Sequence, residues 1–153
     1  MPGIDDLDGL YEQIVLDHYR NPRSASLIKD ATVDVEVNNP FCGDEIRLQV
    51  AITAVGKVSA ISVSGRGCAI SQSSGSLMAR LIESRNAEEL RALAGLARRL
   101  LTGKEVTEAE LDSVGDLAAL AGVRKFPVRV KCALLAWSAL EEAAEKLAAA
   151  KSG

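Results

Sequence analysis

The sequence predicts an α+β fold in which a small antiparallel three-stranded sheet packs against several helices. Three short runs of alternating apolar and polar residues lie between residues 32 and 64, and helical spacing of apolar residues dominates after residue 70. Period-two alternation is typical of strands with one buried face, and that face needs helices to cover it. A chain of 153 residues is about one domain, so we expect a single domain over residues 1–153.

A first helix is predicted before the strands, from about residue 7 to residue 20. Pro22 ends it, because the residue before a proline is disfavoured in the helical conformation. The side chains that recur at helical spacing are Leu7, Leu10, Tyr11, Ile14, Val15 and His18.

Each of the three predicted strands has one apolar face. The short connection Val55–Lys57 predicts that the second and third strands form an antiparallel hairpin. The residues of the apolar faces are Val33, Val35 and Val37 in the first strand, Ile46, Leu48, Val50 and Ile52 in the second, and Ile61 and Val63 in the third, which runs from Lys57 to Ser64.

The rest of the chain is predicted to be helical. One helix runs from Ser71 to Ser84, and the small residues of Ser71–Ser76 begin it and pack closely against the sheet. Asn86–Glu89 resembles a helix cap, and Thr107–Glu110 has the spacing of a capping box. Gly115–Gly122 is expected to be partly helical.

The last helix is predicted to follow Pro127. We expect this proline to break the chain, and the helix to run from about Cys132 to Ala149. Its predicted buried stripe consists of Trp137, Leu140, Ala144 and Leu147.

The composition argues against two classes of partner. The net charge is −3, from 18 basic and 21 acidic side chains, whereas nucleic-acid binders usually show a basic excess. Aromatic residues are 3% of the chain, too few for a platform that stacks bases. No apolar run approaches a membrane span, and the acidic start lacks the positive charge of a secretory signal. We therefore expect a cytoplasmic protein that binds neither nucleic acid nor membranes.

The chain has three cysteines, Cys42, Cys68 and Cys132. An odd and sparse set is a poor disulfide framework, so in a reducing compartment these side chains are thiols. Their roles then lie between core packing, metal binding and reactivity, and a single buried cysteine is more often a small core hydrophobe. Each of the three falls at a predicted junction between elements, where functional sites are usually built.

The local sequence favours a metal site. Gly43 separates Cys42 from Asp44 in a predicted turn, which can aim a thiolate and a carboxylate at one point. Cys68 and Cys132 each stand near a predicted helix start, where the helix dipole favours the thiolate. Three thiolates and one carboxylate make four ligands, the usual number for a closed zinc site.

The charge of such a site predicts basic neighbours. The four ligands carry about four negative charges and a dication leaves about two, so a partly dry site needs nearby cations. Arg66 precedes the second cysteine, and Arg129 and Lys131 precede the third, so these side chains can supply the charge.

Three motifs resemble the SufU proteins of the IscU/SufU family. They are Asn39–Asp44 with the sequence NPFCGD, Gly65–Ser71 with GRGCAIS, and Arg129–Trp137 with RVKCALLAW. The opening segment Leu10–Arg23 is similar to the first helix of the same family. The resemblance covers about residues 7–147, with the three motifs in the family's order.

Two features favour the SufU type over the IscU type. IscU-type proteins have a histidine immediately before the third cysteine, where this chain has Lys131. SufU-type proteins carry an insertion before that cysteine, and Gly115–Phe126 resembles it.

The resemblance implies a tightly held zinc on Cys42, Asp44, Cys68 and Cys132. It also implies a partner, a pyridoxal-phosphate cysteine desulfurase of the SufS type, which strips sulfur from cysteine and holds it as a persulfide. In the family, a histidine of the desulfurase replaces one cysteine on zinc, and the freed thiolate accepts the sulfur. By motif position the acceptor is Cys42, and Arg129 helps the exchange.

Three functions stay open at this point. The leading one is a zinc-dependent sulfurtransferase that serves iron–sulfur cluster assembly, with downstream Suf scaffold proteins as further partners. It is an enzyme only in a loose sense, because the desulfurase performs the carbon–sulfur chemistry. The alternative is a scaffold on which a [2Fe–2S] cluster is assembled, since thiolates suit both metals, although the missing histidine and the insertion disfavour it. The third is a domain in which zinc only stabilises the fold.

Overall fold

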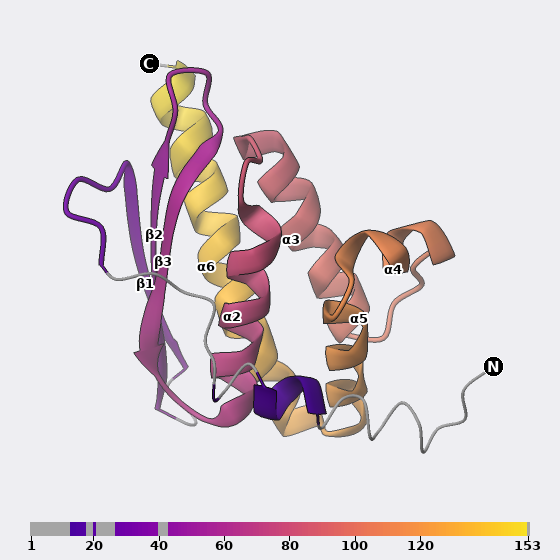
Figure 1. Cartoon of the computed structure of the whole chain (residues 1–153). Coiled ribbons are helices and arrows are strands. Elements are labelled where there is room, and N and C mark those ends of the chain that lie inside the picture. The colour runs from indigo at the N-terminus through magenta and orange to yellow at the C-terminus, as the bar shows by residue number, and fades with distance from the viewer. Residues whose placement is uncertain (1–12, 18–19, 21–26, 40–42, 153) are drawn as a thin grey trace.

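The computed structural model contains a three-stranded antiparallel sheet in the order β1-β2-β3 (Figure 1). Its strands are β1 (Val33–Asn39), β2 (Asp44–Ile52) and β3 (Val58–Arg66). The part of the chain that the structure describes comprises residues 13–17, 20, 27–39 and 43–152.

The register of the sheet follows the predicted alternation. Leu48 in the central strand lies opposite Val35 of β1 and Val63 of β3, and all three side chains are buried. The tight connection between β2 and β3 has Gly56 at φ +82°, a conformation that glycine adopts without steric cost. The predicted hairpin between the second and third strands is therefore confirmed.

Helices make up most of the remaining chain and confirm the predicted α+β class. Both predicted caps are full capping boxes: Asn86 pairs with Glu89, and Thr107 pairs with Glu110. The helices are α2 (Ala69–Ile82), α3 (Ala87–Leu101), α4 (Glu108–Val114), α5 (Leu117–Leu120), the 3-10 helix η1 (Ala121–Lys125) and α6 (Pro127–Ser152).

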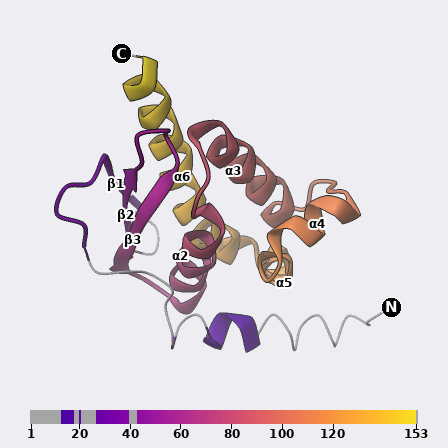
Figure 2. The same ribbon diagram turned by 45° about the horizontal axis from the view of Figure 1, so that its top comes forward.

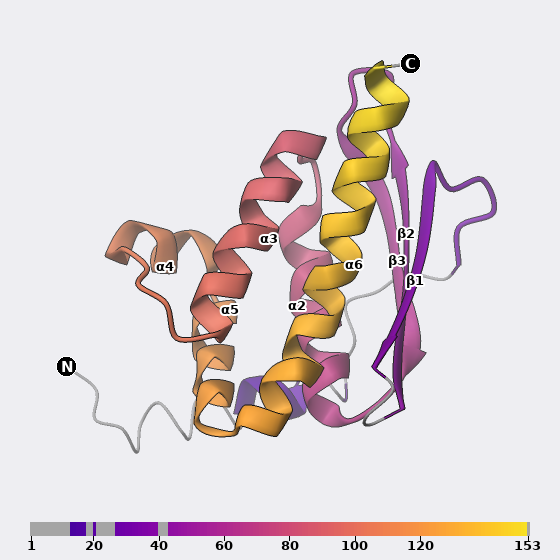
Figure 3. The ribbon, with the colours of Figure 1, turned by 180° about the vertical axis from the view of Figure 1, so that it is seen from behind.

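The elements are stacked in layers, with helices on one face of the sheet (Figure 2). Helix α6 packs against β1 and β2, and α2 packs against β3. Helix α3 covers α6 from the outside, while α4 and α5 lie farther from the sheet (Figure 3). The predicted stripe of α6 is buried in this core, with Trp137 and Leu140 both fully enclosed.

Two predicted helix starts are wrong. The last helix begins at Pro127 and not near Cys132, because a proline at the first helical position loses no hydrogen bond and has the φ that a helix needs. Helix α2 begins at Ala69, two residues before Ser71, because the chain turns directly from the end of β3 into the helix.

The predicted N-terminal helix falls largely outside the described residues. Residues 13–17 are helical, and Val15 is buried. The hydroxyl of Ser73 donates a hydrogen bond of 2.6 Å to the carbonyl oxygen of Val15, which ties this segment to α2.

Candidate metal centre

Three of the four predicted ligands meet at one end of the molecule. Asp44 begins β2, Cys68 lies immediately before α2, and Cys132 lies in the second turn of α6. One ligand atom from each residue falls within 4.8 Å of the other two. The sheet and the two helices that cover it therefore converge on this point, at the end where β3 leads into α2 (Figure 1).

Asp44 is a buried carboxylate, with 1% of its surface exposed. It shares the inward parity of Ile46 and Leu48 along β2, so the strand that builds the core also carries this acid inward. The backbone N–H of Cys68 donates a 3.1 Å hydrogen bond to Asp44 Oδ1. Buried carboxylates in proteins are normally paired with a cation, hydrogen-bonded or bound to a metal, so the burial of Asp44 is consistent with a metal ligand.

Cys68 is the N-cap residue of α2, and its side chain makes no capping bond. Its Sγ lies 4.0 Å from Asp44 Oδ2 and 4.0 Å from Ser71 Oγ. Cys68 therefore stands at the end of α2 where the first backbone N–H groups carry partial positive charge.

Cys132 is buried, with 2% exposure, and it faces the core side of α6. A buried hydrogen-bond chain fixes its helix against α2. The hydroxyl of Ser74 donates to the carbonyl oxygen of Ala133 at 2.6 Å and accepts from Trp137 Nε1 at 3.0 Å. Because α6 begins five residues earlier, the helix-start dipole that the sequence suggested for Cys132 does not act on it.

Two glycines let the ligand-bearing segments approach closely. A Cβ on Gly67 would lie 2.4 Å from Asp44 Oδ1 and 2.4 Å from Ser71 Oγ. A Cβ on Gly65 would lie 1.9 Å from the backbone carbonyl oxygen of Glu45. The space beside Gly67 that admits the Asp44 carboxylate arises only in the tertiary structure.

The donor set suits zinc. Two sulfur atoms and one carboxylate oxygen are ligand types that zinc accepts, at about 2.3 Å for sulfur and about 2.0–2.2 Å for oxygen. Ligand atoms around a tetrahedral zinc then lie about 3.5–3.8 Å apart. The 4.0 Å between Cys68 Sγ and Asp44 Oδ2 is close to that spacing. A dication among these three atoms would also compensate the cost of burying their charges.

The other predicted site residues are placed as follows. Cys42, the fourth predicted ligand, lies outside the described residues; beside it in sequence, Gly43 N–H donates to the carbonyl oxygen of Asn39 at 2.9 Å. Arg66 pairs with Glu45 at 3.2 Å. Arg129 and Lys131 lie on the exposed side of the first two turns of α6.

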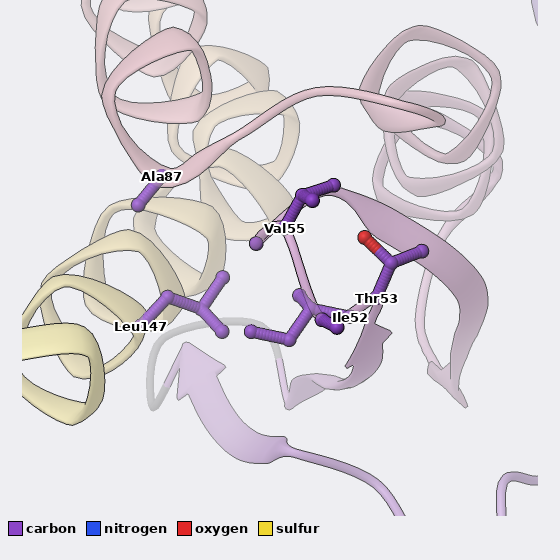
Figure 4. A pocket seen from close by; sticks show the side chains of 7 residues that line it. Ile52, Thr53, Val55, Ala87 and Leu147 are labelled. Carbon is purple, nitrogen blue, oxygen red and sulfur yellow. The ribbon is translucent and has the colours of Figure 1, made fainter.

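A separate hollow of about 320 Å³ lies at the opposite end of the molecule, by the β2–β3 turn (Figure 4). Ile52, Val55 and Leu147 line it with apolar side chains, and none of the predicted site residues that the structure describes belongs to its lining. Elsewhere, no helix in the described ranges is both long and apolar enough to span a membrane.

Most of the chain matches one protein family. Residues 10–133 match the model of the NifU-like N-terminal domain. The zinc-dependent sulfurtransferase SufU of Bacillus subtilis strain 168 is 40% identical over 141 residues, which cover 92% of this chain and 93% of that protein. The iron–sulfur cluster assembly scaffold protein IscU of Streptococcus pyogenes serotype M1 is 37% identical over 148 residues, which cover 97% and 91%.

A solved structure agrees with the fold. The crystal structure of a hypothetical protein superposes with a TM-score of 0.80 at 38% identity, covering 90% of this chain and 98% of that one. The two proteins therefore share one architecture, as their sequence identity predicts. On the family match and these relatives, the chain belongs to the NifU-like N-terminal domain family, in the group that includes SufU and IscU.

Proposed function

We propose that this protein is a zinc-dependent sulfur acceptor that takes persulfide sulfur from a SufS-type cysteine desulfurase for iron–sulfur cluster assembly. The observation that carries the proposal is the convergence of Asp44, Cys68 and Cys132 within 4.8 Å. The similarity to a zinc-dependent sulfurtransferase over 92% of the chain supports the choice of metal and of chemistry.

The proposed zinc ligands are these three residues together with Cys42. When bound, zinc holds its cysteine ligands as thiolates at neutral pH. The protein's own contribution is to fix two ligands on rigid elements, with Cys68 at the start of α2 and Cys132 inside α6. In the sequence, Cys42 falls between the last residue of β1 and the first residue of β2, and we propose it as the ligand that leaves and reacts.

The proposed transfer is a thiolate–persulfide exchange. The Cys42 thiolate attacks the terminal sulfur of the desulfurase persulfide, so that a new sulfur–sulfur bond forms as the old one breaks. The electron pair of the broken bond stays on the desulfurase cysteine, which leaves as a thiolate, and no external oxidant or reductant is required. Arg129, exposed near the start of α6, is the proposed cation that steadies the negative charges during the exchange.

The proposed setting follows from the same chemistry. The proposed location is the reducing cytoplasm, where cysteines such as Cys68 stay reduced and available to a metal. Downstream Suf scaffold proteins are the proposed recipients of the sulfur. A second candidate function has one observation in its favour: the similarity to a scaffold protein IscU at 37% identity, whose role the same donor set can serve by holding a [2Fe–2S] cluster.

Sulfur uptake tests the proposal. The purified zinc-loaded protein is incubated with a SufS-type desulfurase and sulfur-35-labelled cysteine, and label on this chain is followed after non-reducing separation. We expect label on the wild type and none on Cys42→Ala. Uptake by Cys42→Ala at the wild-type rate would remove Cys42 as the acceptor, and no uptake by the zinc-loaded wild type would favour a purely structural metal site.

A further inference from the structure

Ser71 is a buried hydroxyl at the rim of the ligand cluster. It lies in the first turn of α2 with no exposed surface, three residues after Cys68. Its Oγ is 4.0 Å from Cys68 Sγ and 3.1 Å from the Cys68 carbonyl oxygen. Ser71 Oγ and Asp44 Oδ1 both lie 2.4 Å from the position that a Cβ on Gly67 would take, so the hydroxyl borders the same small space as the carboxylate.

The Ser71 hydroxyl has one proton, which it donates to the carbonyl oxygen of Cys68 at 3.1 Å, and the protonated thiol of Cys68 donates to Ser71 Oγ at 4.0 Å. A serine in a first helical turn commonly donates to a carbonyl three residues back, so that bond alone has no special meaning. A metal-bound thiolate changes the balance, because it has no proton and is a charged acceptor. A hydrogen bond to a charged acceptor is roughly twice as strong as one to a neutral acceptor.

The neighbouring serines of α2 face elsewhere. Ser73 donates to the carbonyl oxygen of Val15, and Ser74 donates to that of Ala133. These two hydroxyls tie α2 to other segments and reach no ligand atom. Ser71 is therefore the member of this run that combines full burial with proximity to a ligand sulfur.

We infer that Ser71 is a positioning residue that anchors Cys68 as a permanent metal ligand. By donating to the Cys68 thiolate, its hydroxyl lowers the nucleophilicity of that sulfur and holds the side chain in place. Sulfur transfer is thereby directed to another cysteine of the site. This inference rests on the proposed function for its consequence, but the anchoring itself can be measured without any sulfur transfer.

The first test uses cobalt in place of zinc. Thiolate-to-cobalt charge-transfer absorption reports the donor strength of the sulfur, which a hydrogen bond weakens. We expect Ser71→Ala to shift this band to lower energy and to lower the zinc affinity by about tenfold, as measured by competition with a chromophoric chelator. Ser71→Thr keeps the hydroxyl and should retain the wild-type band.

Ser73→Ala is the matched control, because it removes an equally buried hydroxyl of the same helix that touches no ligand. Its folded protein should keep the wild-type band and affinity. An unshifted band in folded Ser71→Ala, or an equal shift in Ser73→Ala, would overturn the inference.

The second test maps the sulfur by mass spectrometry after incubation with the desulfurase and cysteine. The wild type should carry none on Cys68, whereas Ser71→Ala should carry a measurable fraction there. Sulfur absent from Cys68 in Ser71→Ala but present elsewhere would contradict the directing role. If no cysteine of the wild type takes up sulfur, the proposed function fails, while the cobalt spectrum still decides whether Ser71 anchors Cys68.

Discussion

Replacing Gly67 with alanine should damage the metal site while leaving every proposed ligand in the sequence. The added Cβ would lie 2.4 Å from Asp44 Oδ1 and from Ser71 Oγ, and 2.9 Å from Asp44 Cγ. Ordinary contact begins at 3.4 Å, so the carboxylate must retreat by about 1 Å. Metal–ligand distances tolerate about 0.2 Å, so Asp44 would be lost as a ligand.

The expected loss of zinc affinity is about 100-fold or more, because disturbing even a supporting group costs about 10- to 100-fold. That factor corresponds to about 2.7 kcal/mol of binding free energy. The assay is competition for zinc with a chromophoric chelator, on protein whose circular dichroism shows that it is folded. Gly95→Ala is the control, because a Cβ there meets nothing within 4 Å. Wild-type affinity in folded Gly67→Ala would refute the placement of Asp44 in the site.

Three further predictions concern the stability of the fold. Gly65→Ala should lower the free energy of unfolding by about 3 kcal/mol or more, because its Cβ would lie 1.9 Å from a β2 carbonyl oxygen. Urea denaturation measures this loss, and an unchanged midpoint would contradict the close approach of the two strands. Trp137→Phe removes the bond to Ser74 and should cost about 1–3 kcal/mol by the same assay; a neutral effect would mean that this bond contributes nothing. The ion pair with Arg99 lowers the pKa of Glu110 from its ordinary 4.5 to about 2, so its contribution to stability is present above pH 4.5 and is lost as the pH falls towards 2. Glu110→Gln should flatten the fall in stability over that range, and an unchanged acid profile would show that the pair does not stabilise the fold.

Much of the fold could be predicted because it depends on local patterns. The alternation in β2 placed Leu48 inward, and the buried stripe of α6 included Trp137, as the structure has them. The sequence was ambiguous where one residue type suits two structural positions. Pro127 can end one segment or occupy the first position of a helix, and in the structure it begins α6.

The residues that meet in the candidate site were easier to predict from the sequence than the contacts that bring them together. The sequence placed Asp44 and Cys68 at junctions, and the structure brings both next to Cys132. Asp44 also shares the inward parity of Ile46, a signal that predicts its burial without a structure. The role of Ser71 had no such signal, because its contact with Cys68 depends on the start of α2 and on the space beside a glycine.

The basic residues near the site were also predicted only in part. Arg66 lies close to Cys68 in sequence, yet its guanidinium pairs with Glu45 across the β2–β3 ladder. Spacing along the chain identified a basic neighbour but not its partner, because cross-strand pairing brings residues of opposite charge together.

The proposed zinc site is tested most directly by the metal and acid-labile sulfide content of the protein purified without oxygen, measured beside Asp44→Ala. Asp112→Ala, which removes an exposed carboxylate of α4, is the control. We expect about one zinc per chain without labile sulfide in the wild type and the control, and weakened or lost zinc in Asp44→Ala. Iron with stoichiometric sulfide in the wild type would contradict a zinc-dependent sulfur acceptor and establish a cluster scaffold instead.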